Sequence, residues 1–234
     1  VAHGLAEIDP TPSLKGALTP VDKRSFSAIT KPEEVGALLR AIDAYQGHAA
    51  TRYALQLSPL VFLRPGNLRG ALWAWVDIDS AMMTIPAEAL KRTRVGKRQP
   101  GSDHLVPLSR QAVTILTELR PLSGRSPYLF PSLRAPLVRC MSENTVLAAL
   151  RRMGYPKESM TGHGFRHMAS TLLNEMGFDS DAIERQLAHK PQGVRAVYNR
   201  AEYLAERTRM MQAWADYLDG LRRGGDVVPL RRGG

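Results

Sequence analysis

The chain opens with two stretches in which apolar residues recur at helical spacing. In 31–45, Pro32 and two acids mark a helix start, and four apolar residues then fall on one stripe. The four are Val35, Leu38, Leu39 and Ile42. The next stretch, 49–63, is more apolar and predicts a buried helix, whereas 64–75 indicates a turn followed by a short helix.

Residues 76–108 change to the short apolar runs that are typical of strands. The sequence VDIDSAMMTIP, 76–86, predicts two strands around a turn, and HLVPLS, 104–109, predicts a third. Between them lies KRTRVGKR, 91–98, with five positive charges and no negative one. We therefore expect a small antiparallel sheet from which a basic loop projects.

Helical patterns return after the third strand. Ser109 is placed to cap a helix over 110–122, since its hydroxyl can accept a hydrogen bond from the first helical turn. Ser142 and Thr145 begin a second helix, which Gly154 ends. The peptide between these two helices includes a short extended piece.

Three further helices are expected in the last third of the chain, and they cover 164–176, 180–188 and 203–222. The final helix carries one apolar stripe, which indicates packing against a core. The stripe consists of Leu204, Met211, Trp214, Leu218 and Leu221. The expected fold class is therefore mainly α with a small antiparallel β-sheet (α+β).

The length and composition favour one sizeable domain. The chain has 234 residues, of which 44% are apolar. Residues 1–25 hold three prolines and little periodicity and are interpreted as a linker or N-terminal arm, 26–222 as one domain and 223–234 as a C-terminal tail. The absence of an initiator Met is consistent with a fragment of a longer protein. Cys140 stands alone, which fits a reducing compartment and a small, half-buried hydrophobic role.

The charge of the chain changes the picture from a generic globular domain to a binder of polyanions. Lys and Arg exceed Asp and Glu by 32 − 22 = 10. Clustering of the positive charge favours nucleic acid over a membrane, and no run approaches the roughly 18 apolar residues of a membrane span. The candidate DNA contacts are Arg69, Arg92, Arg94, Lys97 and Arg98. Arg69 equally fits a pair with an acid.

The stretch TGHGFRHM places two histidines and an arginine on one face of a helix start. His163 and His167, four apart, resemble half of a zinc-binding helix. However, residue 164 is Gly rather than the Glu of an HExxH site, and no third ligand follows at a diagnostic spacing. A metal site is therefore disfavoured, while a polar helix start and a phosphate-binding site both remain open.

Four other features favour the phosphate-binding site. Arg64 follows a buried helix, His189 stands at the end of another, Tyr198 lies nine residues further on, and the basic loop supplies Lys91 and Lys97. Arginine binds phosphate in bidentate fashion, imidazole and lysine transfer protons, and a tyrosine oxygen can form a covalent intermediate. Together these side chains match the demands of metal-free phosphoryl transfer.

In this order and spacing the residues resemble the tyrosine recombinases, above all the phage and genomic-island integrases of bacteria. The resemblance rests on LRPGNLRG around Arg64, HGFR at 163–166, LAH at 187–189 and VYNRAEY around Tyr198. It covers about residues 26–222 and implies the catalytic-domain fold of that family.

The resemblance implies a role for each residue. Tyr198 is expected to attack a DNA phosphate and form a 3′-phosphotyrosine. Arg64 and Arg166 are expected to hold the non-bridging oxygens, with a further hydrogen bond from His189. His163 is expected to assist proton transfer at the tyrosine.

A lysine of the hairpin loop is expected to protonate the leaving 5′-oxygen. Lys91 is favoured because TIPAEALK aligns with the family's approach to this lysine, but about ten residues, more than usual, separate it from the next strand. Lys97 therefore remains the alternative. His104 is a weaker candidate neighbour of the phosphate, and Tyr203, Tyr217 and His167 are interpreted as packing or bystander residues.

The resemblance also implies partners and location. The expected partners are double-stranded DNA attachment sites, further copies in a tetrameric synapse on DNA, and an accessory factor that sets direction. Neither cofactor nor ATP is expected, and the location implied is the cytoplasm of a bacterium, associated with the nucleoid. The N-terminal DNA-binding domains usual in such integrases do not fit into residues 1–25, so DNA binding by this chain alone is expected to be weak. The tail is expected to dock within the chain or on a neighbouring copy.

Two alternatives remain at this point. A type IB topoisomerase uses similar residues but relaxes supercoils without exchanging partners. A DNA-binding module that has lost catalysis is disfavoured because Arg64, His163, Arg166, His189 and Tyr198 are all present.

Overall fold

The computed structural model describes residues 27–90, 103–189 and 202–224. Several predictions therefore lie outside the described residues. They concern the arm 1–25, the tail beyond 224, the basic-loop residues Lys91, Arg92, Arg94, Lys97 and Arg98, and Tyr198.

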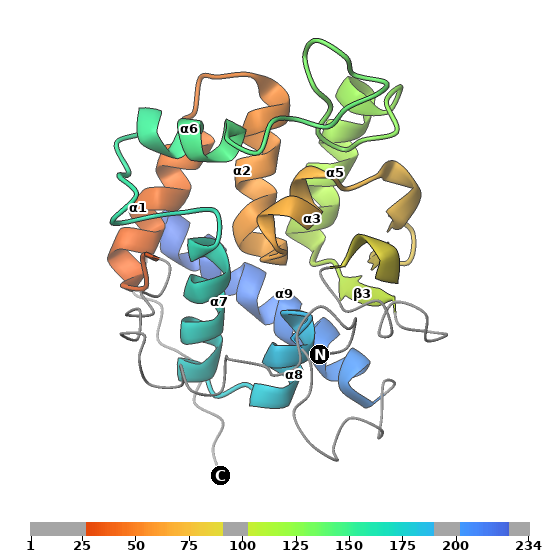
Figure 1. The fold of residues 1–234 in the computed structure, drawn as a ribbon. Helices are drawn as coiled ribbons and strands as arrows, with labels where there is room; N and C mark the ends of the chain where they lie inside the picture. The colour runs from red at the N-terminus through yellow and green to blue at the C-terminus, as the bar shows by residue number, and fades with distance from the viewer. Residues whose placement is uncertain (1–26, 91–102, 190–201, 225–234) are drawn as a thin grey trace, which may run out of the picture.

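The described chain is mainly helical, as predicted (Figure 1). The helices are α1 (Pro32–Asp43), α2 (Ala49–Val61), α3 (Pro65–Arg69), α5 (Arg110–Ser123), α6 (Thr145–Arg152), α7 (Gly164–Glu175), α8 (Ser180–Gln186) and α9 (Glu202–Arg223), with short 3-10 turns η2 (Trp73–Trp75) and η3 (Ala87–Ala89). Ser109 accepts a hydrogen bond from the Ala112 amide at 3.3 Å, which confirms the predicted cap of α5. No helix in this part of the chain has the length and apolar character needed to cross a bilayer.

One local prediction was incomplete. In 64–75 the helix α3 begins directly after Arg64, before the predicted turn, and the short 3-10 helix η2 follows that turn. The reason is Pro65, which occupies the first helical position, where its fixed φ favours a helix and its missing amide costs nothing.

The sheet has the predicted antiparallel arrangement. Its strands β1 (Val76–Asp77), β2 (Met82–Ile85) and β3 (His104–Pro107) lie in the order β1-β2-β3. Met83 pairs with Val106 in the register of β2 and β3, and both side chains are fully buried. The sheet thus packs one face against the helical core.

Helix α9 runs through the back of the fold and contacts α1, α2, α8 and β3 (Figure 1). Trp214, fully buried, meets Phe62 edge-on at 6.5 Å and stacks on Tyr217 at 5.9 Å between ring centroids. Its Nε1 donates to the Pro59 carbonyl at 2.8 Å. The last helix of the chain is therefore fastened to α2, whose end carries the first candidate site residue.

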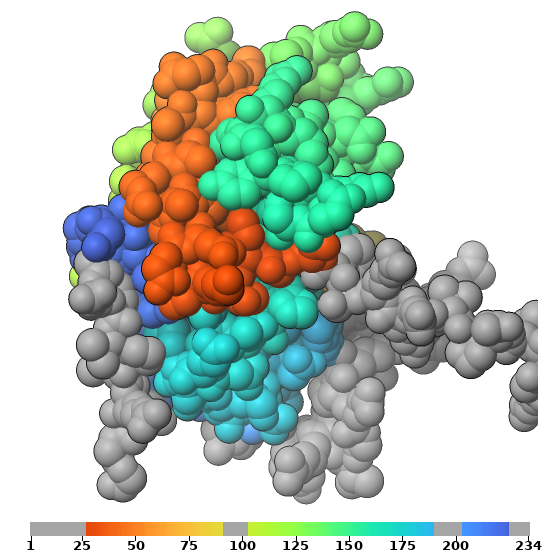
Figure 2. All heavy atoms as spheres, turned by 90° about the vertical axis from the view of Figure 1, so that its left-hand side faces the viewer, coloured from red at the N-terminus to blue at the C-terminus, as the bar shows by residue number. Residues whose placement is uncertain are grey.

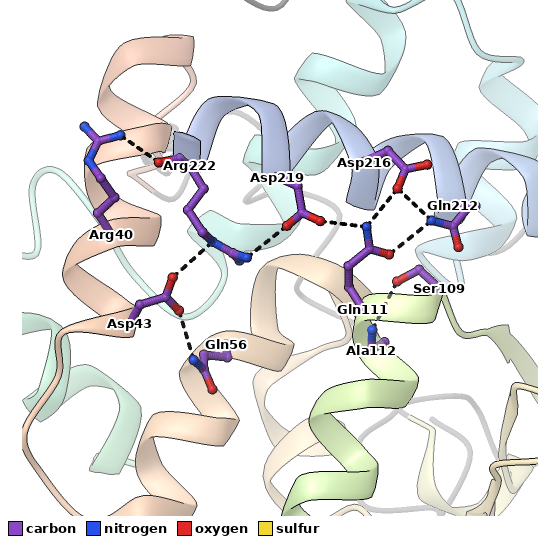
Figure 3. A network of polar contacts seen from close by, with 10 residues as sticks. All are labelled: Arg40, Asp43, Gln56, Ser109, Gln111, Ala112, Gln212, Asp216, Asp219 and Arg222. Carbon is purple, nitrogen blue, oxygen red and sulfur yellow. Dashed lines mark hydrogen bonds and ion pairs between the residues drawn. The ribbon is translucent and has the colours of Figure 1, made fainter. Parts of the chain in front are cut away.

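A polar network joins the other side of α9 to α1 and α5 (Figure 3). Arg222 lies 3.1 Å from an oxygen of Asp43 and 2.9 Å from one of Asp219. Gln111 of α5 donates to both Asp216 and Asp219 at 2.8 Å. Figure 2 shows the side of the molecule that lies at the left of Figure 1, where α1 lies above α7.

The closest approach of α1 to α9 generates a prediction at Gly36. A Cβ added there would lie 2.4 Å from the carbonyl oxygen of Leu221, a backbone atom that cannot turn aside. Gly36→Ala is expected to lower the free energy of unfolding by about 1–3 kcal/mol, as overpacking does. Urea denaturation measures the change.

Gly66→Ala is the matched control, because a Cβ at that helical position meets nothing within 4 Å. It is expected to leave stability unchanged or raise it by up to about 1 kcal/mol. Equal stability of the two variants would contradict the close packing of α1 on α9.

Candidate active site

A pocket of about 330 Å³ collects the candidate residues that the structure describes. Its lining consists of Arg64, His163, Arg166, His167, Ser170, Thr171, Glu184, Leu187 and His189. The four predicted residues Arg64, His163, Arg166 and His189 come from three segments far apart in sequence, so only folding brings them together.

Arg64 lies at the junction between α2 and α3. The residue that ends α2, Phe62, has a left-handed backbone (φ 34°), which turns the chain sharply before the arginine. The Arg64 Nη2 donates to the Ala188 carbonyl at 3.2 Å. Partial burial lowers the pKa of Arg64.

Arg166 lies in the first turn of α7 and is only 8% exposed. It donates to the carbonyls of Phe62 at 2.8 Å and Leu187 at 2.7 Å. Burial, followed by repulsion from Arg64, lowers the pKa of Arg166 to about 10, while the Glu184 charge opposes this shift. The guanidinium therefore remains positive at neutral pH although its hydration has largely been removed.

His189 lies between an acid and this arginine. Its Nδ1 is 2.6 Å from an oxygen of Glu184, and its Nε2 is 3.3 Å from Nη2 of Arg166. Because a guanidinium can only donate, Nε2 accepts and Nδ1–H donates to Glu184. In this tautomer His189 has a basic nitrogen facing the arginines.

Sequence reasoning missed Glu184. Its only signal was a carboxylate on the helix that leads to His189, and such a position fits an ordinary exposed acid equally well. The pairing is settled by the end of α8, which turns His189 back towards its own helix.

The end of α8 organises the pocket through its backbone; we call residues Gln186–His189 the α8 turn. Carbonyls at a helix end lack helical partners and must find other donors. Here the carbonyls of Gln186, Leu187 and Ala188 each accept from a side chain. The donors are, in the same order, His104 Nε2 (3.1 Å), Arg166 Nη2 (2.7 Å) and Arg64 Nη2 (3.2 Å). Both arginines are thus held by neighbouring carbonyls of one turn.

The turn closes on itself at Ala188. This residue has a left-handed backbone (φ 51°), and the amides of Ala188 and His189 donate to the carbonyls of Arg185 and Glu184, both at 3.0 Å. This is the usual way of ending a helix, but glycine normally occupies the left-handed position.

The remaining candidates lie in different places. His163 precedes α7 and lines the pocket, as does His167, and both are exposed. His104 is buried beneath the α8 turn and does not line the pocket. Arg69 donates to Cys140 Sγ at 3.2 Å and to the Met141 carbonyl at 3.1 Å, so its partners here are neutral groups and not an acid.

The two tyrosines of α9 take structural positions. Tyr217 is buried against Trp214, and Tyr203 bonds an oxygen of Asp181 at 3.4 Å. Both therefore pack, as predicted. In the described ranges, no three His, Cys, Asp or Glu side chains are grouped so as to hold a metal ion.

Comparison with known proteins identifies the family. The model of the phage integrase family matches residues 29–204, and the chain belongs to this family. The integrase of Enterobacteria phage P4 is 42% identical over 227 residues, with 94% of this chain and 51% of that protein covered. The prophage integrase IntZ of Escherichia coli is 41% identical over 192 residues, covering 82% of this chain and 45% of the relative. The chain spans about half the length of these curated relatives.

Two solved structures share the fold. An integrase from mycobacterium phage Brujita superposes with a TM-score of 0.57 at 16% identity, covering all of this chain and 68% of that one. XerA recombinase superposes with a TM-score of 0.53 at 18% identity, covering 80% of this chain and 65% of that one. The α+β catalytic-domain fold expected from the sequence is thereby confirmed.

The left-handed residue of the α8 turn can be tested by substitution. Ala188→Gly removes the Cβ that disfavours this backbone conformation, so the variant is expected to be about 0.5–1 kcal/mol more stable. Ala148→Gly, at an exposed position inside α6, is the control and is expected to lose about 1 kcal/mol. Chemical denaturation measures both values, and a loss at both positions would rule out the left-handed turn.

Proposed function

We propose that this chain is the catalytic domain of a site-specific DNA recombinase that cleaves and rejoins DNA through a 3′-phosphotyrosine. The observation that carries the proposal is the pocket in which Arg64 and Arg166 lie side by side on consecutive carbonyls of the α8 turn. Two positive, partly dehydrated forks at one point are suited to an anion with several oxygens, such as a phosphodiester in its transition state.

In the proposed first step, the Tyr198 oxygen bonds to phosphorus as the bond to the 5′-oxygen breaks. The tyrosine proton moves towards His163, and the leaving oxygen takes a proton from Lys91. Arg64 and Arg166 neutralise the charge that builds on the non-bridging oxygens. In the second step a 5′-hydroxyl attacks the phosphotyrosine, so the backbone bond is restored without ATP.

His189 has a defined part in this scheme. Its ring lies between Glu184, 2.6 Å from Nδ1, and Arg166, 3.3 Å from Nε2. In the proposed complex His189 supplies a further hydrogen bond to a phosphate oxygen held by the arginines.

The wider assignment follows from the same proposal. The substrates are duplex attachment sites of a mobile element, and strand exchange uses a synapse of four copies with an accessory factor that sets direction. Cytoplasmic action at the nucleoid follows from that substrate. The candidate contacts outside the pocket are Arg69, Arg92, Arg94, Lys97 and Arg98.

The decisive experiment is covalent trapping on DNA. A nicked suicide duplex carrying an attachment site should yield a protein–DNA adduct that survives denaturation and forms in EDTA. Tyr198→Phe should abolish it, because no oxygen remains to bond phosphorus. Tyr203→Phe is the control and should retain the adduct. An adduct that persists without the Tyr198 hydroxyl excludes this residue as the nucleophile.

The same assay decides which lysine is the general acid. Lys91→Ala is expected to slow cleavage by about 100–1,000-fold, because the 5′-oxygen leaves poorly without a proton. A substrate with sulfur in place of that oxygen should restore the rate, since a thiolate leaves unprotonated. Lys97→Ala is expected to remain within about 3-fold of the unsubstituted chain. The opposite pattern assigns the role to Lys97.

A further inference from the structure

A buried arginine of α9 lies directly behind the α8 turn. Arg207 is 6% exposed, and its Nε and Nη2 donate to the side-chain oxygen of Gln186 at 3.0 and 2.6 Å. Its Nη2 also donates to the Leu105 carbonyl of β3. One guanidinium therefore joins α9, α8 and the sheet.

This arrangement is not what stability alone would favour. Arg207 donates to the neutral oxygens of Gln186 and Leu105. Burial, followed by repulsion from Arg185, lowers the pKa of Arg207 to about 10. A buried cation whose partners are uncharged is costly, and an apolar side chain of similar volume often stabilises a core better. The fork geometry of arginine offers something else, namely a fixed direction for the group it binds.

Arg207 binds Gln186, the first residue of the α8 turn. The Gln186 side chain is fully buried and held by Arg207, while its backbone carbonyl accepts from His104 at 3.1 Å. The next two carbonyls, of Leu187 and Ala188, hold Arg166 and Arg64. The residue held by Arg207 is therefore continuous in the backbone with the two carbonyls that hold the arginines of the pocket.

We propose that Arg207 and Gln186 are a buried positioning pair, which fixes the α8 turn so that Arg64, Arg166 and His189 meet one phosphate together. Neither residue lines the pocket. The pair acts through the carbonyls of the turn, and its effect on catalysis rests on the proposed function.

The matched control lies on the same helix. Arg222 is also an arginine of α9 in a polar network, and its partners Asp43 and Asp219 belong to α1 and to α9 itself (Figure 3). Neither partner is a residue of the α8 turn. Arg207→Met and Arg222→Met both remove a guanidinium from α9. Only Arg207→Met removes a side chain that binds the α8 turn.

The experiment compares single-turnover cleavage of the suicide duplex with DNA affinity and melting temperature, at a temperature where each variant is folded. Arg207→Met is expected to cleave about 100-fold more slowly, the effect of small misplacements in active sites, while its Kd for DNA changes less than about 3-fold. Arg222→Met should cleave at a rate within about 2-fold of the unsubstituted chain, whatever its melting temperature. Arg207→Lys, which keeps the charge but not the fork, should fall between, and it replaces Arg207→Met if that variant does not fold.

A second readout does not depend on cleavage. The amides of Ala188 and His189 tie the turn to the carbonyls of Arg185 and Glu184 in α8, so their hydrogen exchange should accelerate in Arg207→Met and stay unchanged in Arg222→Met. If the unsubstituted chain does not cleave DNA, the proposed function fails but this exchange result still tests the positioning pair. Normal exchange at these amides in Arg207→Met, or cleavage that falls only in step with melting temperature in both variants, would overturn the proposal.

Discussion

Two arginine side chains, whose positive charges repel each other, are held in one pocket by carbonyls at the end of α8 that have no partner within the helix. Those oxygens carry the negative end of the helix dipole, and they accept from Arg64 and Arg166 at adjacent residues. The arrangement satisfies a helix end that would otherwise be exposed to the pocket, and it concentrates positive charge where water is partly excluded. Burial, followed by repulsion from Arg64, lowers the pKa of Arg166 to about 10, yet the charge is retained. A pocket of this kind is suited to an anion.

A carboxylate beside His189 offsets part of the positive charge of the same pocket. Glu184 accepts from Nδ1 of the imidazole, which fixes the tautomer, and its charge opposes the lowering of the Arg166 pKa. The carboxylate, the imidazole and the guanidinium of Arg166 thus form one chain of contacts at the edge of the pocket.

Helix α9 connects this pocket to the rest of the fold. Its middle packs Trp214 against the end of α2, next to Arg64, and its first half holds Gln186 through Arg207. Its last turns are tied to α1 and α5 (Figure 3). Helix α9 also follows the segment 190–201 that contains Tyr198, so the residue proposed as nucleophile is joined in sequence to the same helix that supports the α8 turn. The geometry of the two arginines and the attachment of that segment thus share one structural element.

The helices, the three-stranded sheet and the family could be predicted from the sequence, because each depends on local information. The apolar periodicity predicted the buried stripes of α1 and α9, and Ser109 marked the start of α5. The motifs around Arg64, Arg166 and His189 each occupy a few adjacent residues. The roles of Lys91, Lys97 and Tyr198 stay predictions. Nothing in the sequence marks Glu184, Gln186 and Arg207 as part of the site, because they look like ordinary polar residues of amphipathic helices. Their importance comes from hydrogen bonds between distant segments, such as Arg207 to Leu105, and from burial of a charge. Only tertiary packing decides which polar side chains lose their water, and a polar group without water must bond whatever the fold places beside it.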